Sequence, residues 1–275
     1  MNAVAAPAPA TSVLLEAQQI TRRFGGLVAV DAVDMAVSAG TIHGLIGPNG
    51  AGKTTLLNVI AGAYPVTSGA LRFAGADITR STAAQRARSG IRRTFQNLKL
   101  FRDMTALENV SIGVHTETRA GIFDALVRTS RHRREEREIL ERSAAALEFV
   151  GLAAFTHARA TMLAYGHRRL LEIARAIVAG PKLLLLDEPA AGLNETEASS
   201  LTELIRRIRA RGATIVLVEH HMDVVMTVCD EITVLNYGRR LAHGSPAQIQ
   251  NDAAVIEAYL GRGDEFLAET ANAHA

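Results

Sequence analysis

The stretch Gly47-Pro48-Asn49-Gly50-Ala51-Gly52-Lys53-Thr54-Thr55 matches the full phosphate-loop pattern of two glycines, a lysine and a hydroxyl side chain. The glycines allow a tight turn in which successive N–H groups converge on a phosphate, and a following helix adds its positive N-terminal end. In such a loop Lys53 bridges the β- and γ-phosphates of a nucleotide, and the Thr54 hydroxyl coordinates Mg²⁺. The residues expected to bind the nucleotide are Gly47, Asn49, Gly50, Ala51, Gly52, Lys53, Thr54 and Thr55.

The sequence on either side of this loop supplies the setting that it requires. Residues 41–46 have the pattern of a buried strand, and residues 54–61 have the pattern of a helix that ends near Gly62 and Pro65. A strand, a glycine-rich loop and a helix in this order form a phosphate-binding unit. A glycine turn that arose by chance is therefore the weaker interpretation.

The strand patterns predict an α/β protein. Alternating apolar and polar residues at 28–34, together with residues 13–20, predict an antiparallel β layer near the N-terminus. Apolar runs at 182–187 and 214–219 are separated by an amphipathic helical segment. Strands that alternate with helices in this way imply a largely parallel sheet.

The middle of the chain, residues 102–160, has a mostly helical pattern and is expected to be inserted into the α/β core. Gly151 is placed to end one helix of this segment, and Gly180-Pro181 is placed to end a second helix over residues 168–179. The apolar face expected of the first helix consists of Ile139, Leu140, Ala144 and Leu147.

Composition excludes several classes of protein. The 275 residues include 48% hydrophobic and 21% charged residues, with a formal net charge of +2, which gives no support for nucleic-acid binding. The mixed charges at 131–141 favour a solvated helix face over a basic patch for nucleic acid or phospholipid. A single cysteine, Cys229, rules out an internal disulfide and is expected to be a small buried apolar residue. No apolar run approaches the ~18 residues of a membrane-spanning helix, so a cytoplasmic protein is expected.

Two acidic residues, Asp187 and Glu188, follow the apolar run Leu183-Leu184-Leu185-Leu186. Open α/β sheets bind ligands at the carboxyl ends of their strands. Because neighbouring residues of a strand point in opposite directions, the two carboxylates are expected to have separate roles. Asp187 suits a contact to Mg²⁺, and Glu188 suits a general base for an attacking water.

Taken together, these motifs resemble the ATP-binding subunits of ABC transporters over almost the entire chain after about residue 12. The resemblance implies that ATP and Mg²⁺ are bound and that Phe24 stacks on adenine. It further implies that Gln96 contacts Mg²⁺ and the attacking water, and that His220 reaches the γ-phosphate. Residues 192–194 resemble the loop that contacts the partner subunit. His221, next to His220, is expected at the surface, and a shared metal site is not expected.

Leu163-Ala164-Tyr165-Gly166-His167 occupies the place of the family's signature motif, commonly Leu-Ser-Gly-Gly-Gln. Ala164 lacks the serine hydroxyl, whereas Gly166 and the helix N-terminus leave backbone N–H groups for an anion. Ala164 and Gly166 are therefore expected to bind a partner's nucleotide. The Ala-Tyr-Gly form resembles that of one ATPase subunit of branched-chain amino acid importers. Whether both composite sites are active, and what His167 and His221 do, stay open.

The resemblance implies a P-loop NTPase (RecA-like) core with an antiparallel β subdomain and an inserted α-helical subdomain. The expected divisions are 1–11, a disordered leader; 12–96, the nucleotide-binding core with the antiparallel β subdomain; 97–165, the helical subdomain ending at the signature; 166–246, the second part of the core; and 247–275, a C-terminal helix and tail.

The implied partners are a second ABC ATPase subunit (a sister chain, or a copy of itself), two membrane permease subunits and an extracytoplasmic solute-binding protein, with no nucleic acid. The implied location is the inner face of the plasma membrane. The implied activity is hydrolysis of ATP coupled to uptake of branched-chain or related hydrophobic amino acids. The alternatives are the ATPase of an exporter, such as a lipopolysaccharide exporter, and a non-transport ABC ATPase. A regulatory nucleotide-binding module without turnover is disfavoured by Glu188 and His220.

Overall fold

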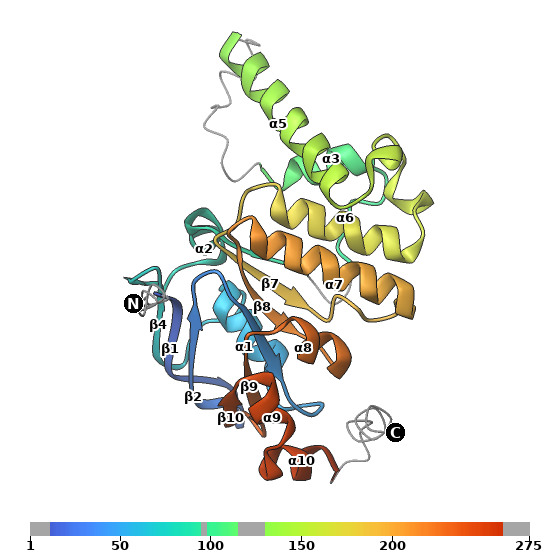
Figure 1. Cartoon of the computed structure of the whole chain (residues 1–275). Coiled ribbons are helices and arrows are strands. Elements are labelled where there is room, and N and C mark those ends of the chain that lie inside the picture. The colour runs from blue at the N-terminus through green and yellow to red at the C-terminus, as the bar shows by residue number, and fades with distance from the viewer. Residues whose placement is uncertain (1–11, 95–97, 115–129, 261–275) are drawn as a thin grey trace, which may run out of the picture.

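The computed structural model describes residues 12–94, 98–114 and 130–260, and contains two sheets with helices around them (Figure 1). The side chains of 130–133 and 260 lie outside this description. Within the described ranges, no helix is both long enough and apolar enough to cross a bilayer. The expected leader at 1–11 and the tail beyond 260 lie outside the described residues.

The larger sheet has six strands in the order β10-β9-β3-β8-β7-β6. All neighbouring strands are parallel except β10, which pairs antiparallel with β9. The predicted strands at 41–46, 182–187 and 214–219 are therefore confirmed, as is their parallel pairing. The strands are β3 (Ile42–Ile46), β6 (Ile91–Arg93), β7 (Leu183–Asp187), β8 (Thr214–Val218), β9 (Glu231–Asn236) and β10 (Arg239–Gly244).

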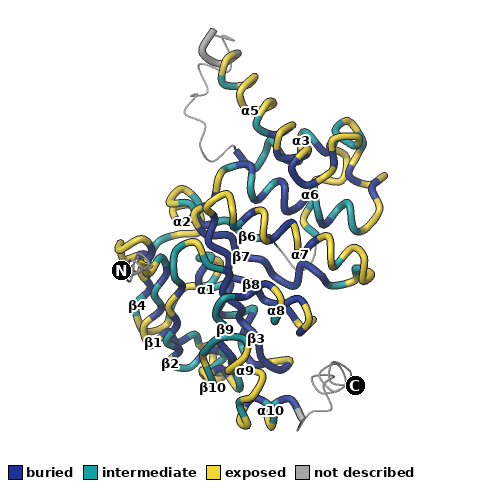
Figure 2. The backbone as a smooth tube through the Cα atoms, viewed as in Figure 1, coloured by how far each residue is buried: buried dark blue, intermediate teal, exposed yellow. Residues whose placement is uncertain are grey.

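The central strands are continuously apolar because both faces of this sheet are covered. In β7, Leu184 and Leu186 point into a core shared with the helices, whereas Leu183 and Leu185 point into a second core shared with the antiparallel sheet. All four are fully buried, and each contributes roughly 2 kcal/mol of transfer free energy. Figure 2 shows these strands as a buried band through the middle of the molecule.

The smaller sheet is antiparallel, in the order β2-β1-β4-β5. Strands β1 (Val13–Phe24) and β2 (Leu27–Ser38) confirm the β layer predicted from alternation at 13–20 and 28–34. Two further strands, β4 (Ser68–Phe73) and β5 (Ala76–Asp77), were not foreseen. Between the sheets lies α1 (Lys53–Ala61), whose Leu56, Leu57, Val59 and Ile60 fill the second core. Gly62 ends α1 with a left-handed backbone, as predicted.

Helices α3 (Ala106–Ile112), α5 (Ser130–Phe149) and α6 (Tyr165–Ile177) pack together beyond the edge of the large sheet (Figure 1). Helix α3 starts with a capping box, in which Thr105 and Glu108 satisfy each other's backbone N–H groups. The helical character predicted for the middle of the chain is confirmed in the described residues. Helix α6 begins three residues earlier than the predicted 168, so Tyr165 and Gly166 belong to its first turn. The expected subdomain boundaries stay a prediction.

The buried face of α5 differs from the predicted one. Ile139 and Leu147 pack inward, but Leu140 is 42% exposed and Ala144 is also exposed. The face follows positions 139, 143, 146, 147 and 150, which share one side at 3.6 residues per turn. It includes the buried Ser143, whose hydroxyl donates to the Ile139 carbonyl (2.7 Å). A pattern of apolar residues does not predict this buried position, because serine is polar. Gly151 follows the helix with φ +84°, as its place in the sequence predicted.

The remaining helices are α2 (Ala83–Ser89), α7 (Glu195–Ala210), α8 (Met222–Val228), α9 (Pro246–Gln250) and α10 (Ala253–Leu260), with short 3₁₀ turns η1 (Ala153–Phe155) and η2 (Ala160–Met162). Helix α7 is the amphipathic helix predicted between β7 and β8. Cys229, at the end of α8, is buried as expected, and burial raises the pKa of its thiol to about 12.

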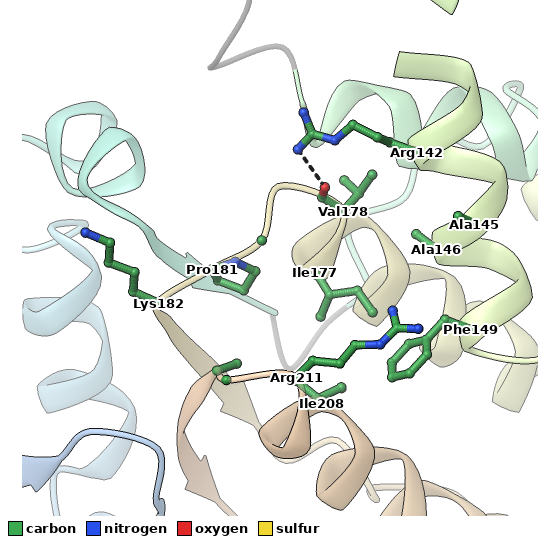
Figure 3. Close-up of a pocket in the computed structure, with 13 residues that line it drawn as sticks. Arg142, Ala145, Ala146, Phe149, Ile177, Val178, Pro181, Lys182, Ile208 and Arg211 are labelled. Atoms are coloured by element: carbon green, nitrogen blue, oxygen red, sulfur yellow. Dashed lines mark hydrogen bonds between the residues drawn. The ribbon is translucent and has the colours of Figure 1, made fainter. Parts of the chain in front are cut away.

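A cavity of about 540 Å³ lies at the seam between α5, α6 and the end of α7 (Figure 3). The Arg211 guanidinium lies 3.6 Å from the centre of the Phe149 ring, and Arg142 donates to the Val178 carbonyl (3.0 Å). Lys182 extends away from Phe149. Arg142 and Arg211 therefore join α5 to the core, whereas Lys182 points away from Phe149. The cavity is lined by Arg142, Ala145, Ala146, Phe149, Ile177, Val178, Gly180, Pro181, Lys182, Ile208, Arg211, Gly212 and Ala213.

Candidate nucleotide site

A groove of about 510 Å³ opens at the carboxyl ends of the parallel strands, where open α/β sheets bind ligands. It brings together the predicted phosphate loop, Glu188 and His220, from three segments far apart in the sequence. Residues at the start of β2 and the turn between β9 and β10 complete its wall. The lining residues are Leu27, Val28, Ala29, Asn49, Gly50, Ala51, Gly52, Lys53, Thr54, Thr55, Glu188, His220, Tyr237 and Gly238.

The loop itself has the backbone that its glycines were expected to provide. Gly47, Gly50 and Gly52 have φ values of +146°, +80° and +102°, in the left-handed half of conformational space. A Cβ on Gly47 would lie 2.1 Å from the Leu235 carbonyl oxygen, and one on Gly52 would lie 2.5 Å from that of Ala29. Both glycines are thus required by close backbone contacts as well as by conformation.

The start of α1 is suited to bind an anion. Its N-cap residue, Gly52, has no side chain to accept a hydrogen bond from the first turn. The N–H groups of that turn and the positive end of the helix are therefore directed at the groove. Lys53 is 5% exposed and donates from Nζ to the carbonyls of Gly47 (2.6 Å) and Pro48 (3.1 Å). The ammonium group thus lies against the carbonyl oxygens of the phosphate loop.

Asp187 is the last residue of β7 and is 1% exposed. Arg93 donates from Nη2 to its Oδ2 atom (2.8 Å), while Oδ1 is buried with no hydrogen-bond partner in the described part of the chain. Burial raises the pKa of this carboxyl, and the Arg93 hydrogen bond and charge oppose that rise. A buried carboxylate oxygen without a hydrogen-bond partner in the described part of the chain fits the oxygen ligands that Mg²⁺ prefers.

Glu188 lies just beyond β7 rather than on it. Its backbone has φ +47°, and its N–H donates to the Val218 carbonyl (2.8 Å). The sequence predicted that strand alternation separates Asp187 from Glu188, and this reason is wrong. Glu188 lies outside the strand and has a left-handed backbone conformation. The turn leaves the Glu188 carboxylate at the groove, and its Oε1 atom lies 2.6 Å from Nε2 of His220.

The two adjacent histidines follow β8, which ends at Val218, so strand alternation does not separate them either. Both histidines are exposed, but only His220 lines the groove, and His221 occupies the N-cap position of α8. Their positions are set by Glu219, which is 2% exposed. Its carboxylate accepts from the backbone N–H groups of Ala190 (2.6 Å) and His220 (3.0 Å). Burial raises the pKa of Glu219 and these hydrogen bonds oppose the rise.

Phe24 does not line the groove. Its ring is 38% exposed and meets Tyr64 edge-on, with centroids 5.2 Å apart, while Arg22 lies 4.4 Å from its centre. Leu27, three residues later, and Tyr237 do line it. Tyr237 was not predicted, because a tyrosine in a hairpin turn carries no signal in the sequence. Gln96 lies outside the described residues.

The signature segment is separate from this chain's own groove. Ala164 is the N-cap residue of α6 and has no side-chain cap, and Gly166 packs against Glu197 of α7. The Tyr165 hydroxyl donates to the Ala191 carbonyl (3.2 Å), which joins α6 to the loop after Glu188. Neither Ala164 nor Gly166 lines the groove at the phosphate loop. One chain therefore does not bring these two sequence motifs together.

Comparison with known proteins decides the family. A family model described as "ABC transporter" matches residues 30–191, a span that includes the phosphate loop, the signature segment and Glu188. This chain belongs to the ABC transporter family. A second model, "Branched-chain amino acid ATP-binding cassette transporter", matches residues 239–265. This ABC protein is thus an ATP-binding, ATP-hydrolysing subunit, as its motifs predicted.

The ABC chain is similar to curated relatives over most of its length. It is 45% identical over 249 residues to the high-affinity branched-chain amino acid transport ATP-binding protein BraF of Pseudomonas aeruginosa, covering 90% of this chain and 98% of BraF. The same figures hold for LivG of Escherichia coli K12. Among solved structures, the ADP conformation of the ABC transporter cassette MJ1267 matches with a TM-score of 0.80 at 32% identity, covering 92% of this chain and 100% of that one. The P-loop NTPase fold predicted from the motifs is confirmed.

Proposed function

We propose that this ABC subunit drives the uptake of branched-chain, or closely related hydrophobic, amino acids. The observation that carries the proposal is the match of residues 239–265 to the family model described as a branched-chain amino acid cassette transporter. The similarity to BraF and LivG, both described as branched-chain amino acid transport proteins, supports the same solute class.

In the proposed mechanism Lys53 and the N–H groups of residues 49–55 bind the phosphates of ATP. Glu188 takes a proton from the attacking water, and His220, hydrogen-bonded to Glu188, contacts the γ-phosphate. Thr54 and Asp187, together with Gln96, would hold Mg²⁺, whose charge stabilises the triphosphate. Phe24 is expected to stack on adenine.

The proposed working unit is a dimer of ABC ATPase subunits. Because Ala164 and Gly166 lie away from this chain's own groove, they suit a nucleotide bound by another subunit. The second ATPase subunit is either a sister chain or a second copy. Two membrane permease subunits and an extracytoplasmic solute-binding protein would complete the transporter, with this chain on the cytoplasmic face of the membrane.

Reconstitution tests the proposal. The purified subunit, assembled with its permeases in proteoliposomes, should hydrolyse ATP faster when a solute-binding protein loaded with leucine, isoleucine or valine is present outside. If only a polar amino acid stimulated ATP hydrolysis, the proposed class of transported solute would be wrong. ATP-dependent movement of solute outward would reverse the direction and favour an exporter, whereas co-purification with nucleic acid instead of permeases would favour a non-transport role.

A further inference from the structure

Two parts of the ATPase site, the end of β7 and helix α1, are joined at one side chain, Arg93. It is the last residue of β6 and lies beside β7, with Arg93 paired to Leu185 in the parallel register. Its guanidinium donates from Nη2 to Oδ2 of Asp187 (2.8 Å) and from Nη1 to Oδ1 of Asn58. The side chains of Arg93 and Asp187 are 8% and 1% exposed, so this ion pair is shielded from water.

The second bond leads to the phosphate loop. Asn58 lies in α1, one turn after Thr54, and donates from Nδ2 to the Thr54 carbonyl (2.7 Å). A continuous series of hydrogen bonds therefore runs from Thr54 through Asn58 and Arg93 to Asp187. The two ends of this series are the two described residues assigned to the cation. Two side chains, those of Asn58 and Arg93, therefore link these ends.

The bond to Oδ2 leaves the other carboxylate oxygen free. Oδ1 of Asp187 is buried and has no hydrogen-bond partner among the described residues. A buried carboxylate that lost the Arg93 guanidinium would turn toward other donors, because an unpaired buried charge is costly. Arg93 thus holds the carboxylate in one orientation.

We propose that Arg93 is a positioning residue of the ATPase, which fixes Asp187 relative to Thr54 so that both can serve one Mg²⁺ ion. The proposal rests on the assignment of Thr54 and Asp187 to Mg²⁺. Partners that hydrogen-bond to metal-ligating carboxylates typically raise metal affinity or activity about 10–100-fold. The competing effect is electrostatic repulsion between the Arg93 guanidinium and the cation. If repulsion dominated, Mg²⁺ would bind more tightly once Arg93 is removed.

Affinity for N-methylanthraniloyl-ATP, measured by fluorescence in Mg²⁺ and in EDTA, tests the proposal without relying on turnover. In Arg93→Met, we expect the affinity for the nucleotide in EDTA to be unchanged. The Mg²⁺ concentration that gives half of the maximal increase in nucleotide affinity should rise about tenfold or more. Arg93→Lys keeps the charge but not the two-pronged geometry, so it should recover part of the loss. The matched control is Arg92→Met, which removes a guanidinium from the same strand. Arg92 donates to the Ala87 carbonyl rather than to Asp187, so its loss should leave the Mg²⁺ requirement unchanged.

The proposal is overturned if Arg93→Met keeps the wild-type Mg²⁺ requirement, or binds Mg²⁺ more tightly. Should Arg93→Met fail to fold, Arg93→Lys and Asn58→Ala replace it, and an unchanged Mg²⁺ requirement in both overturns the proposal equally. Asn58→Ala leaves the Arg93–Asp187 pair in place, so it should raise the requirement less than Arg93→Met. Failure of the proposed transport function would leave these binding results unaffected, since they need neither permease nor solute.

Discussion

The Nε2 atom of His220 lies 2.6 Å from Oε1 of Glu188, although the two residues are 32 positions apart in the sequence. Glu188 reaches this contact from a left-handed turn after β7, and His220 reaches it from the loop after β8. Parallel pairing of β7 with β8 places both loops at the same edge of the sheet.

Glu188→Gln should separate ATP binding from hydrolysis. Glutamine keeps the size of the side chain and its contact with His220 but cannot accept a proton, so we expect the turnover rate to fall at least about a hundredfold. ATP affinity should stay close to the wild-type value, as measured by equilibrium dialysis. Wild-type turnover by this variant would exclude Glu188 as the general base.

His220→Ala and His221→Ala form a matched pair. Only His220 lines the groove, so only its loss should weaken discrimination between ATP and ADP, by about tenfold for one hydrogen bond to a charged phosphate. The measurement is the ratio of the two dissociation constants by isothermal titration calorimetry. Equal effects of the two substitutions would show that His220 does not contact the γ-phosphate.

Ala164→Ser should stabilise the start of α6. Ala164 has φ −58° and ψ 160°, the extended backbone of an N-cap residue, but no side-chain oxygen to accept a hydrogen bond from the first turn. A serine there is expected to add about 1 kcal/mol to the free energy of unfolding, measured by urea denaturation. Met162→Ser, at a residue that is 79% exposed and precedes the helix, is the control and should leave that free energy unchanged.

His43 predicts a loss of stability in acid. It is fully buried in β3, bonded through Nε2 to Thr233 (2.8 Å), and burial followed by the charge of His243 lowers its pKa to about 3. Between pH 6.5 and 3 the unfolded chain therefore binds a proton that the folded chain does not. The stability contributed by neutral His43 is complete above pH 6.5 and is lost as the pH falls through this window.

Urea denaturation at pH 7 and pH 5 measures this effect. We expect the wild type to lose up to about 1.4 kcal/mol more per pH unit than His43→Gln, which cannot take up the proton. The other titratable groups nearby, His243 and Glu231, are present in both proteins, so the difference isolates His43. Equal pH slopes would assign the acid sensitivity to other groups.

The sequence predicted those parts of the site that depend on neighbours in the chain. The phosphate loop is a continuous motif, and buried parallel strands such as β7 need apolar residues on both faces, so both are visible as local patterns. Arg93 and Glu219 could not be predicted, because Arg93 bonds to Asn58 and Asp187 and Glu219 bonds to Ala190, all distant in sequence. The face of α5 was misjudged for a related reason. Ser143 is buried because its hydroxyl bonds to its own helix and to Ser111, which a hydrophobic pattern cannot register.

The single cysteine gives the protein an experimental advantage. The Cys229 thiol is buried and its pKa is about 12, so it stays protonated and unreactive toward maleimides at neutral pH. A cysteine introduced at exposed Met162, beside the signature helix, would then be the one reactive thiol in the chain. A spin label or fluorophore attached there would report how closely the subunits of the proposed dimer approach, without first removing a native cysteine to avoid background labelling.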